Sequence, residues 1–131
     1  MTKYVKSSDF RSEAESHFRF LSDAYFLGPE EGDYSLSYSS GLFGIEVHYD
    51  DRDGRIVTIV RTSVGERSPR ASLQCLYVTA KLGPAQDIRE IARSTKSIGE
   101  VLESHAEALR KVLPVIEGDG GLELILACHG R

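Results

Sequence analysis

The residues from His48 to Gly54 hold the densest group of side chains able to bind a hard cation. Three aspartates and one histidine fall within these seven residues, and carboxylate oxygens are ligands that Ca²⁺ prefers. The spacing does not fit a calcium-binding loop, because Tyr49 stands where the first aspartate belongs and Val60 where the chelating glutamate is required. We therefore interpret the run as a solvated hairpin turn and expect neither a metal site nor a cofactor.

The other polar residues form no recognised catalytic pattern. The four histidines are dispersed without an H-x-x-x-H pair, and the sequence contains no nucleophile elbow, dinucleotide-binding glycine motif or P-loop. His17 and His105 fall near apolar helix faces, where we expect satisfied core residues. The sequence thus favours a protein that is not an enzyme. The alternative is a small-ligand-binding protein or an enzyme whose site is assembled from dispersed residues such as His48, Arg61 and Tyr77.

Charge is distributed unevenly along the 131 residues. The formal net charge is −4, but residues 1–51 carry four basic and ten acidic groups, whereas residues 52–96 carry nine basic and four acidic groups. Complementary charge accelerates the encounter of a protein with its partner. We therefore predict a protein partner, of basic character, and the sequence also allows a homo-oligomer. The candidate partner-binding residues are Glu30, Glu31, Asp33, Asp50, Asp51 and Asp53.

The basic middle block offers a different binding chemistry. Arg61, Arg67 and Arg70 bracket a loop that contains Gly65 and Pro69, and these arginines are the alternative phosphate-binding residues. Aromatic residues are not interleaved with them, and the chain lacks the basic excess of dedicated nucleic-acid-binding domains. We therefore favour a simpler interpretation over nucleic-acid binding, in which the arginines neutralise the acidic helices.

Cysteine usage and hydropathy indicate the compartment. Cys75 and Cys128 have neither the density of a disulfide-stapled domain nor a C-x-x-C spacing, so we expect two reduced thiols and a cytoplasmic protein. No stretch approaches the roughly 18 apolar residues of a membrane span, and the first residues lack the apolar core of a signal peptide. No membrane partner is expected.

The N-terminal third should begin with a helix. Ser7-Ser8-Asp9 can cap it, and apolar residues recur at helical spacing from Phe10 to Tyr25. Gly28-Pro29 should end it, and an acidic loop follows at residues 30–33.

An alternating pattern then predicts strands. Large side chains alternate with serines over residues 34–40, and apolar residues alternate over 43–50. Asp53-Gly54 predicts a hairpin turn before a third strand over 55–61. A fourth strand is a candidate at Ser72–Lys81, with Cys75 inside it. The tyrosine and serine residues of 34–40 favour a core-facing strand, or a contact surface if this strand lies at an edge.

The last third reads as helical. A short helix should include Ile88, Ile91 and Ala92, and Ser97-x-x-Glu100 resembles a capping box that begins a longer helix. Pro114 should end or kink that helix, and we prefer a final helix capped by Asp119. The apolar face of the long helix comprises Ile98, Val101, Leu102, His105, Leu109, Val112 and Leu113.

This order of elements predicts a single α+β domain over residues 1–131. An antiparallel β-meander of about four strands is flanked by an N-terminal helix and by C-terminal helices, which pack mainly on one face of the sheet. The chain offers no internal repeat and no linker long enough to divide it.

Several stretches of the chain carry a resemblance to a known class of domain. They are the aromatic end of the opening helix at Phe18–Gly28, the hairpin formed by Ile45–Asp50 and Arg55–Val60, and the late helix at Ala108–Leu113. The layout resembles small bacterial α+β domains, including immunity proteins of polymorphic-toxin systems. The resemblance covers most of the layout but no diagnostic motif. It implies a binding role for the protein and no catalytic residues.

Overall fold

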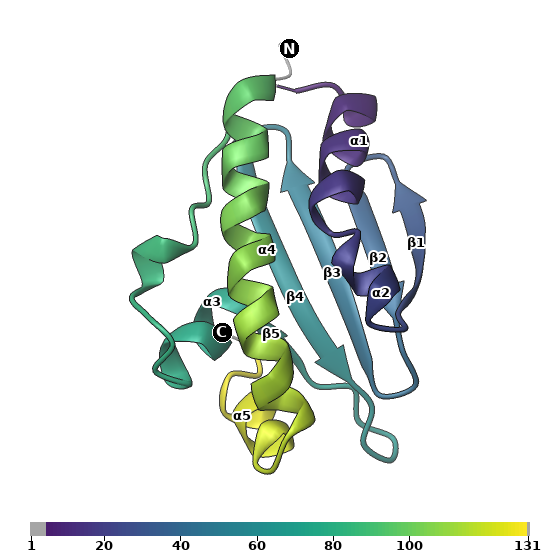
Figure 1. Ribbon diagram of the computed structural model, residues 1–131, viewed down its shortest axis with the longest axis vertical. Helices are drawn as coiled ribbons and strands as arrows, with labels where there is room; N and C mark the ends of the chain where they lie inside the picture. The colour runs from purple at the N-terminus through teal and green to yellow at the C-terminus, as the bar shows by residue number, and fades with distance from the viewer. Residues whose placement is uncertain (1–4, 131) are drawn as a thin grey trace.

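Five antiparallel strands form one sheet whose order follows the chain (Figure 1). The structure is a computed structural model that describes residues 5–130. Each strand pairs with the next one in sequence, so the predicted α+β fold with an antiparallel meander is confirmed. Three of the predicted strands are present, and two further strands, the first and the last of the sheet, were not predicted. The strands are β1 (Leu27–Gly32), β2 (Ser35–Ser39), β3 (Phe43–Asp50), β4 (Arg55–Thr62) and β5 (Arg70–Ser72).

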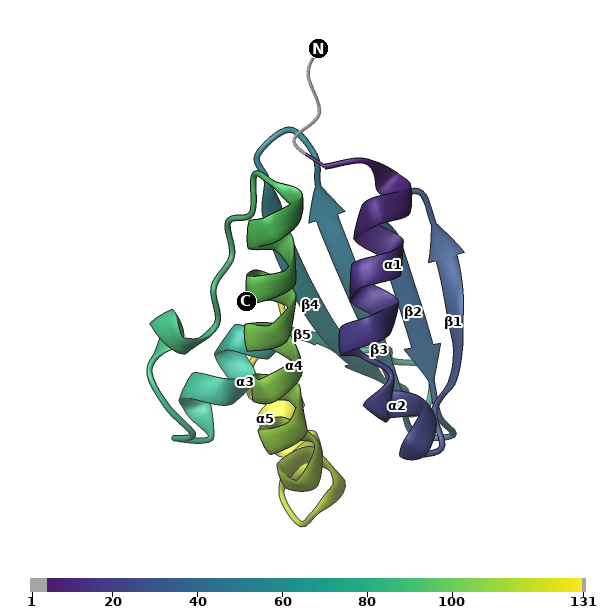
Figure 2. The same ribbon diagram turned by 45° about the horizontal axis from the view of Figure 1, so that its top comes forward.

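Two helices, α1 and α4, lie side by side across one face of this sheet (Figures 1 and 2). Among residues 5–130, no helix is long and apolar enough to cross a membrane. The helices are α1 (Ser7–His17), α2 (Phe20–Asp23), α3 (Leu73–Thr79), the 3-10 turn η1 (Ala85–Asp87), α4 (Thr95–Glu117) and α5 (Gly121–Ala127).

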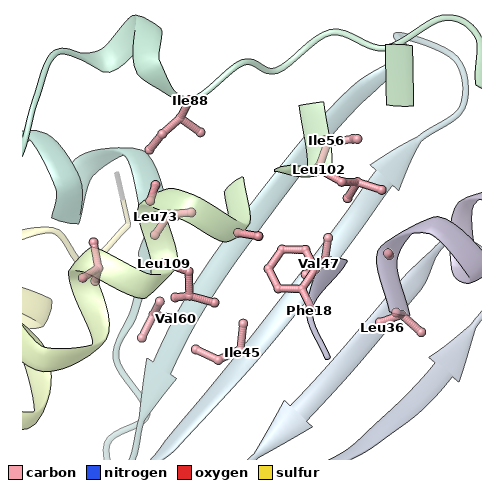
Figure 3. Close-up of a cluster of buried hydrophobic side chains, with 14 of the residues drawn as sticks. Phe18, Leu36, Ile45, Val47, Ile56, Val60, Leu73, Ile88, Leu102 and Leu109 are labelled. Carbon is pink, nitrogen blue, oxygen red and sulfur yellow. The ribbon is translucent and has the colours of Figure 1, made fainter. Parts of the chain in front are cut away.

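The hydrophobic core fills the space between the sheet and these helices (Figure 3). Strands alternate their side chains between two faces, and on β3 and β4 one set is fully buried: Ile45, Val47, Ile56 and Val60. The predicted apolar face of the long helix is buried against them, from Ile98 to Leu113, so that expectation is confirmed.

The predicted N-terminal helix is too long. Helix α1 ends at His17, the short α2 follows, and the Tyr25 side chain is 91% exposed. Gly28 does not stop a helix but lies in β1 at a φ of +124°, where an added Cβ would meet the carbonyl oxygen of Ser37 at 2.7 Å. Glycine therefore permits β1 to approach β2 closely, and the expected acidic loop is part of a strand. The N-cap of α1 is Lys6, and among the described residues no side chain caps this helix, so the predicted Ser7-Ser8-Asp9 cap is wrong.

The segment Ser72–Lys81 is a helix, so the fourth predicted strand is wrong. Ser72 ends β5, and its hydroxyl accepts a hydrogen bond from the Cys75 amide at 3.1 Å, which makes it the N-cap of α3. Leu73, Leu76 and Tyr77 are buried at the three- and four-residue spacing of one helix face. The β-branched and aromatic content of this stretch was a weaker signal than the serine cap.

Helix α4 begins three residues earlier than the Ser97-x-x-Glu100 pattern indicates. Its capping box is formed by Ser94 and Ser97, each of which accepts a hydrogen bond from the backbone amide of the other at 3.1 Å. The predicted short helix before it is only η1 and an extended stretch, in which Ile91 is 44% exposed. Two serines can satisfy the amides at a helix start as well as a Ser/Glu pair does. The predicted capping box of Ser97 and Glu100 is therefore wrong, because Ser97 pairs with Ser94.

The last turn of α4 runs through Pro114 without a break and ends at Glu117. Only one backbone hydrogen bond is lost at a proline, and Pro114 is exposed near the helix end. The preferred C-terminal helix is confirmed as α5, but its N-cap is Gly120 at a φ of +82°, and Asp119 does not cap it.

Cys75 and Cys128 form a disulfide, so the expectation of two reduced thiols is wrong. The bond joins α3 to the residue after α5, across 53 positions of the chain, with a Cα–Cα distance of 5.9 Å. Sequence spacing alone cannot show such tertiary proximity. The disulfide ties the C-terminal segment to the β5 side of the sheet.

Reduction of this disulfide should lower the free energy of unfolding by about 2–4 kcal/mol, because the unfolded chain regains the entropy of a long closed loop. Urea unfolding with and without a phosphine reductant measures the difference. The double variant Cys75→Ala/Cys128→Ala is the control and should not respond to the reductant. A wild-type protein equally indifferent to it would show that the bond does not contribute.

Candidate functional site

The side chains of β2–β5 that point away from α1 and α4 form the second face of the sheet, which we call the open face. On β3 and β4 its side chains are only half-buried, in contrast to the buried set between them, and Gly44 is its one buried position on these strands. The register places Ser37, Glu46, Ile59 and Ser72 in one row across four strands. The open face comprises Ser35, Ser37, Ser39, Gly44, Glu46, His48, Val57, Ile59, Arg61, Arg70 and Ser72.

One carboxylate organises the centre of the open face. Glu46 is 16% exposed, and its Oε2 accepts a hydrogen bond from Arg61 Nε at 2.9 Å. Its Oε1 accepts hydrogen bonds from Arg70 Nη2 at 2.8 Å and from His48 Nε2 at 2.9 Å. These four residues, the Glu46 cluster, come from β3, β4 and β5. The arrangement needs Gly44, since a Cβ there would lie 2.5 Å from the guanidinium carbon of Arg61.

The charges of the Glu46 cluster do not balance. Partial burial alone would raise the pKa of Glu46, but the hydrogen bond from His48 and the positive charges of Arg70 and Arg61 outweigh it and lower this pKa. The carboxylate is therefore ionised at neutral pH. One negative charge faces two guanidinium groups, which leaves an excess of positive charge at the surface.

Two cavities flank the Glu46 cluster. The larger, of about 510 Å³, is lined by Val57, Ile59, Ala71 and Ser72 of the sheet together with Arg70, His129 and Gly130. The smaller, of about 260 Å³, lies on the β1–β2 side of Arg61. The open face is thus hollowed on both sides of a positively charged centre.

The structure brings four of the six candidate acidic residues to one end of the sheet, at the top of Figure 1. Asp33 lies in the β1–β2 turn, and Asp50, Asp51 and Asp53 lie at the β3–β4 turn. A hydrogen bond from the Tyr49 amide to the Tyr34 carbonyl, at 2.9 Å, joins the two turns. We call these four aspartates the acidic end.

The other two candidate acids belong elsewhere. Glu30 pairs across the strands with Ser37 and lines the smaller cavity together with Arg61, whereas Glu31 forms an ion pair with Arg11 at 3.8 Å. Asp50 also has a local role, because its Oδ1 accepts the amides of Arg52 and Asp53 within the turn. The hairpin turn predicted at Asp53-Gly54 is confirmed. Among the described residues, no three His, Cys, Asp or Glu side chains converge on a possible metal site.

The candidate basic residues separate into a pair and an outlier. Arg61 and Arg70 meet at Glu46, whereas Arg67 lies in the 63–69 loop, where its backbone pairs with Val64. We expected these arginines to neutralise acidic residues of the helices. Arg61 and Arg70 instead pair with a carboxylate of strand β3.

The residues suggested for a dispersed enzyme site also do not all meet. His48 and Arg61 share Glu46, but Tyr77 is buried in α3 and donates its hydroxyl hydrogen bond to Asp87 Oδ2 at 2.8 Å. That bond, together with burial, raises the pKa of Tyr77. Tyr77 therefore takes no part in the open face.

The serine–tyrosine strand is not an edge. β2 lies between β1 and β3, with Leu36 and Tyr38 buried in the core and its serines on the open face. The free edge of the sheet on this side is β1, where Pro29 and two glutamates discourage pairing with another strand. A partner cannot add a strand to β2.

His105 is a satisfied core residue, as predicted. Its Nε2 donates to the Arg89 carbonyl at 2.7 Å, and its Nδ1 accepts from the Thr58 hydroxyl at 2.8 Å. Burial lowers its pKa to about 4, against the smaller opposing effect of the Arg89 hydrogen bond. His17 is half-buried and pairs with Glu13 and Glu103, which joins α1 to α4.

No protein-family model, curated protein or solved structure matches this chain. The resemblance to immunity proteins therefore stays a prediction based on the three quoted stretches. The functional proposals below rest on the geometry of the open face and the acidic end.

The buried His105 should make the protein less stable in mild acid. The unfolded chain binds a proton near pH 6.5 but the folded one only near pH 4, so stability is lost as the pH falls through that window. From pH 7 to pH 5 the loss should be roughly 2 kcal/mol. Urea unfolding at both pH values measures it, and His105→Gln should show a smaller loss. An unchanged loss in His105→Gln would contradict this assignment.

Glu46→Gln should destabilise the fold by about 1–2 kcal/mol, because two guanidinium groups lose the charge that holds them together. Chemical unfolding at pH 7 gives the value. The matched control is Glu66→Gln in the exposed 63–69 loop, which should change stability by less than about 0.5 kcal/mol. Equal effects of the two variants would show that Glu46 has no special role.

Proposed function

We propose that this protein is a binding module without catalytic activity, which recognises a basic protein partner through its acidic end. The supporting observation is that two turns distant in sequence place Asp33, Asp50, Asp51 and Asp53 at the same end of the sheet. Asp33 and Asp53 are exposed. Negative charge gathered in this way raises the rate of encounter with a positively charged surface.

The open face supplies the contact area beside the acidic end. Val57 and Ile59 are half-exposed apolar side chains, and Arg61 is held in place by Glu46. Apolar and arginine side chains that are already ordered are typical of the central, water-excluding part of an interface. The serines of β2 are suited to its polar rim.

The immunity-like part of the proposal concerns the identity of the partner. An immunity protein inhibits a toxin by covering its active surface, and here a basic active surface would face the acidic end. A toxin or secretion gene beside the gene for this chain would support this identity, and purified protein should then inhibit that toxin. A gene set of unrelated metabolic enzymes would count against it.

A cytoplasmic location belongs to the same proposal. Disulfides are rare in a reducing cytosol, so Cys75 and Cys128 would be thiols there. The protein would then work with the lower stability that we expect for its reduced form.

Nucleic-acid binding is the competing function. Its sequence candidates Arg61 and Arg70 share the carboxylate of Glu46, which cancels part of the charge that phosphates would need. Binding to RNA or DNA that weakens steeply with salt, and that is lost in Arg61→Gln but not in Asp33→Lys, would favour this alternative.

Charge reversal at the acidic end tests the leading proposal. A partner is first captured from the native cells with tagged protein and then purified. Asp33→Lys/Asp53→Lys should lower its association rate by about tenfold at low salt, because the steering charge is inverted, with a smaller effect at high salt. Surface plasmon resonance measures the association rate at low and at high salt.

The matched control reverses the same charge at a distant site. Glu117→Lys/Asp119→Lys changes two exposed acids between α4 and α5 and should leave the association rate unchanged. Circular dichroism verifies that all variants fold. Equal effects of the two double variants, or none, would overturn the role of the acidic end.

A further inference from the structure

The larger cavity of the open face combines an apolar lining with two polar groups. Val57 and Ile59 contribute its apolar side chains, and Arg70 and His129 contribute a guanidinium and an imidazole. Ala71 pairs with Val60 on the core face of the sheet, so it lines the cavity through its backbone. Its volume of about 510 Å³ lies within the range of pockets that hold small organic ligands. The side chains of Val57, Ile59 and Ser72 that line it belong to the open face, so this cavity lies on the opposite side of the sheet from α1 and α4.

Arg70 has donors to spare at this cavity. A guanidinium carries five N–H groups, and within residues 5–130 its only hydrogen-bond acceptor is Glu46 Oε1, at 2.8 Å from Nη2. Glu46 thus acts as a positioning residue that keeps the Arg70 side chain in one place. The remaining N–H groups are available to an anion.

Within residues 5–130, His129 uses only one of its ring nitrogens for contacts with the protein. Its Nδ1 lies 3.0 Å from the backbone nitrogen of Arg70 and 3.2 Å from the carbonyl oxygen of the same residue. The backbone therefore engages Nδ1 in either tautomer, and Nε2 is the atom that a ligand can reach. The disulfide at Cys128 anchors this histidine beside β5.

Charge balance selects the kind of ligand. The Glu46 cluster has one carboxylate against two guanidinium groups, so one added negative charge would neutralise it. A ligand without charge would shield the Arg70 donors from water without pairing them, which is costly. A ligand with several charges would place some of them against the apolar side chains of Val57 and Ile59.

We propose that this cavity binds a small organic monocarboxylate, with its carboxylate on Arg70 and its hydrocarbon body against Val57 and Ile59. A carboxylate can accept two parallel hydrogen bonds from a guanidinium, and His129 Nε2 is placed to contact the same end of the ligand. Val57 and Ile59 also belong to the contact area proposed for the protein partner, so the ligand and the partner would compete for them. The acidic end is formed by other residues, so the two proposals can be tested separately.

The full chain can be tested with 4-phenylbutyrate as the probe. Two-dimensional amide NMR should show saturable shifts centred on Val57, Ile59 and Ala71, with a Kd of about 1 mM or tighter. The uncharged analogue 4-phenylbutanamide should bind at least about tenfold more weakly, because it cannot pair with Arg70 by charge. Inorganic phosphate, which lacks an apolar body, should also bind more weakly.

Variants separate a built site from general charge attraction. Arg70→Gln should weaken 4-phenylbutyrate binding by at least about tenfold, and Arg70→Lys, which retains the charge for Glu46, should weaken it less. Arg67→Gln removes the same charge outside the cavity and should bind like the wild type. Arg70→Lys keeps the test valid if Arg70→Gln does not fold.

Three results would overturn the proposal. They are the absence of saturable shifts with 4-phenylbutyrate, equal binding of the butanamide, and equal losses in Arg67→Gln and Arg70→Gln. Failure here leaves the charge-reversal experiment on the acidic end unaffected, because none of its substitutions lines the cavity.

Discussion

Burial of one sheet face beneath α1 and α4 is the constraint on which the rest of this structure depends. The alternating side chains of β3 and β4 place Ile45, Val47, Ile56 and Val60 in the core, and removal of such surface from water is the main driving force of folding. The same alternation forces the other side chains onto the open face. Every candidate binding feature on that face therefore follows from how the core is built.

The charge blocks of the sequence resolve into two different outcomes. Glu46, from the acidic first block, forms ion pairs with Arg61 and Arg70 from the basic middle block. Part of the charge difference between the two blocks is therefore neutralised inside the molecule. The aspartates of the two turns are instead collected at one end of the sheet. The molecule thus presents two guanidinium groups around one carboxylate on the open face. At one end of the sheet it presents four aspartates, and Arg52 and Arg55 of the β3–β4 hairpin balance part of their charge.

The sequence predicted secondary structure correctly where the apolar residues followed either the strand period or the helix period and not both. The alternation over residues 43–50 and 55–61 and the apolar face of α4 were predicted almost as they stand. The strand predicted at Ser72–Lys81 was wrong, because residues of high β propensity can also form one face of a helix when a serine caps it. The helix end predicted at Gly28 was wrong, because glycine permits a close contact between strands as readily as it ends a helix.

The sequence by itself determined the α+β class, the meander and the core face of the long helix, because these depend on periodicity within short segments. It also identified Arg61, Arg70 and His48 as candidates. Only the tertiary structure decided that these three share Glu46, that Cys75 meets Cys128, and that His129 lines a cavity with Arg70. Such pairings join residues far apart in the chain, and their proximity depends on strand register and helix packing, which no local pattern encodes.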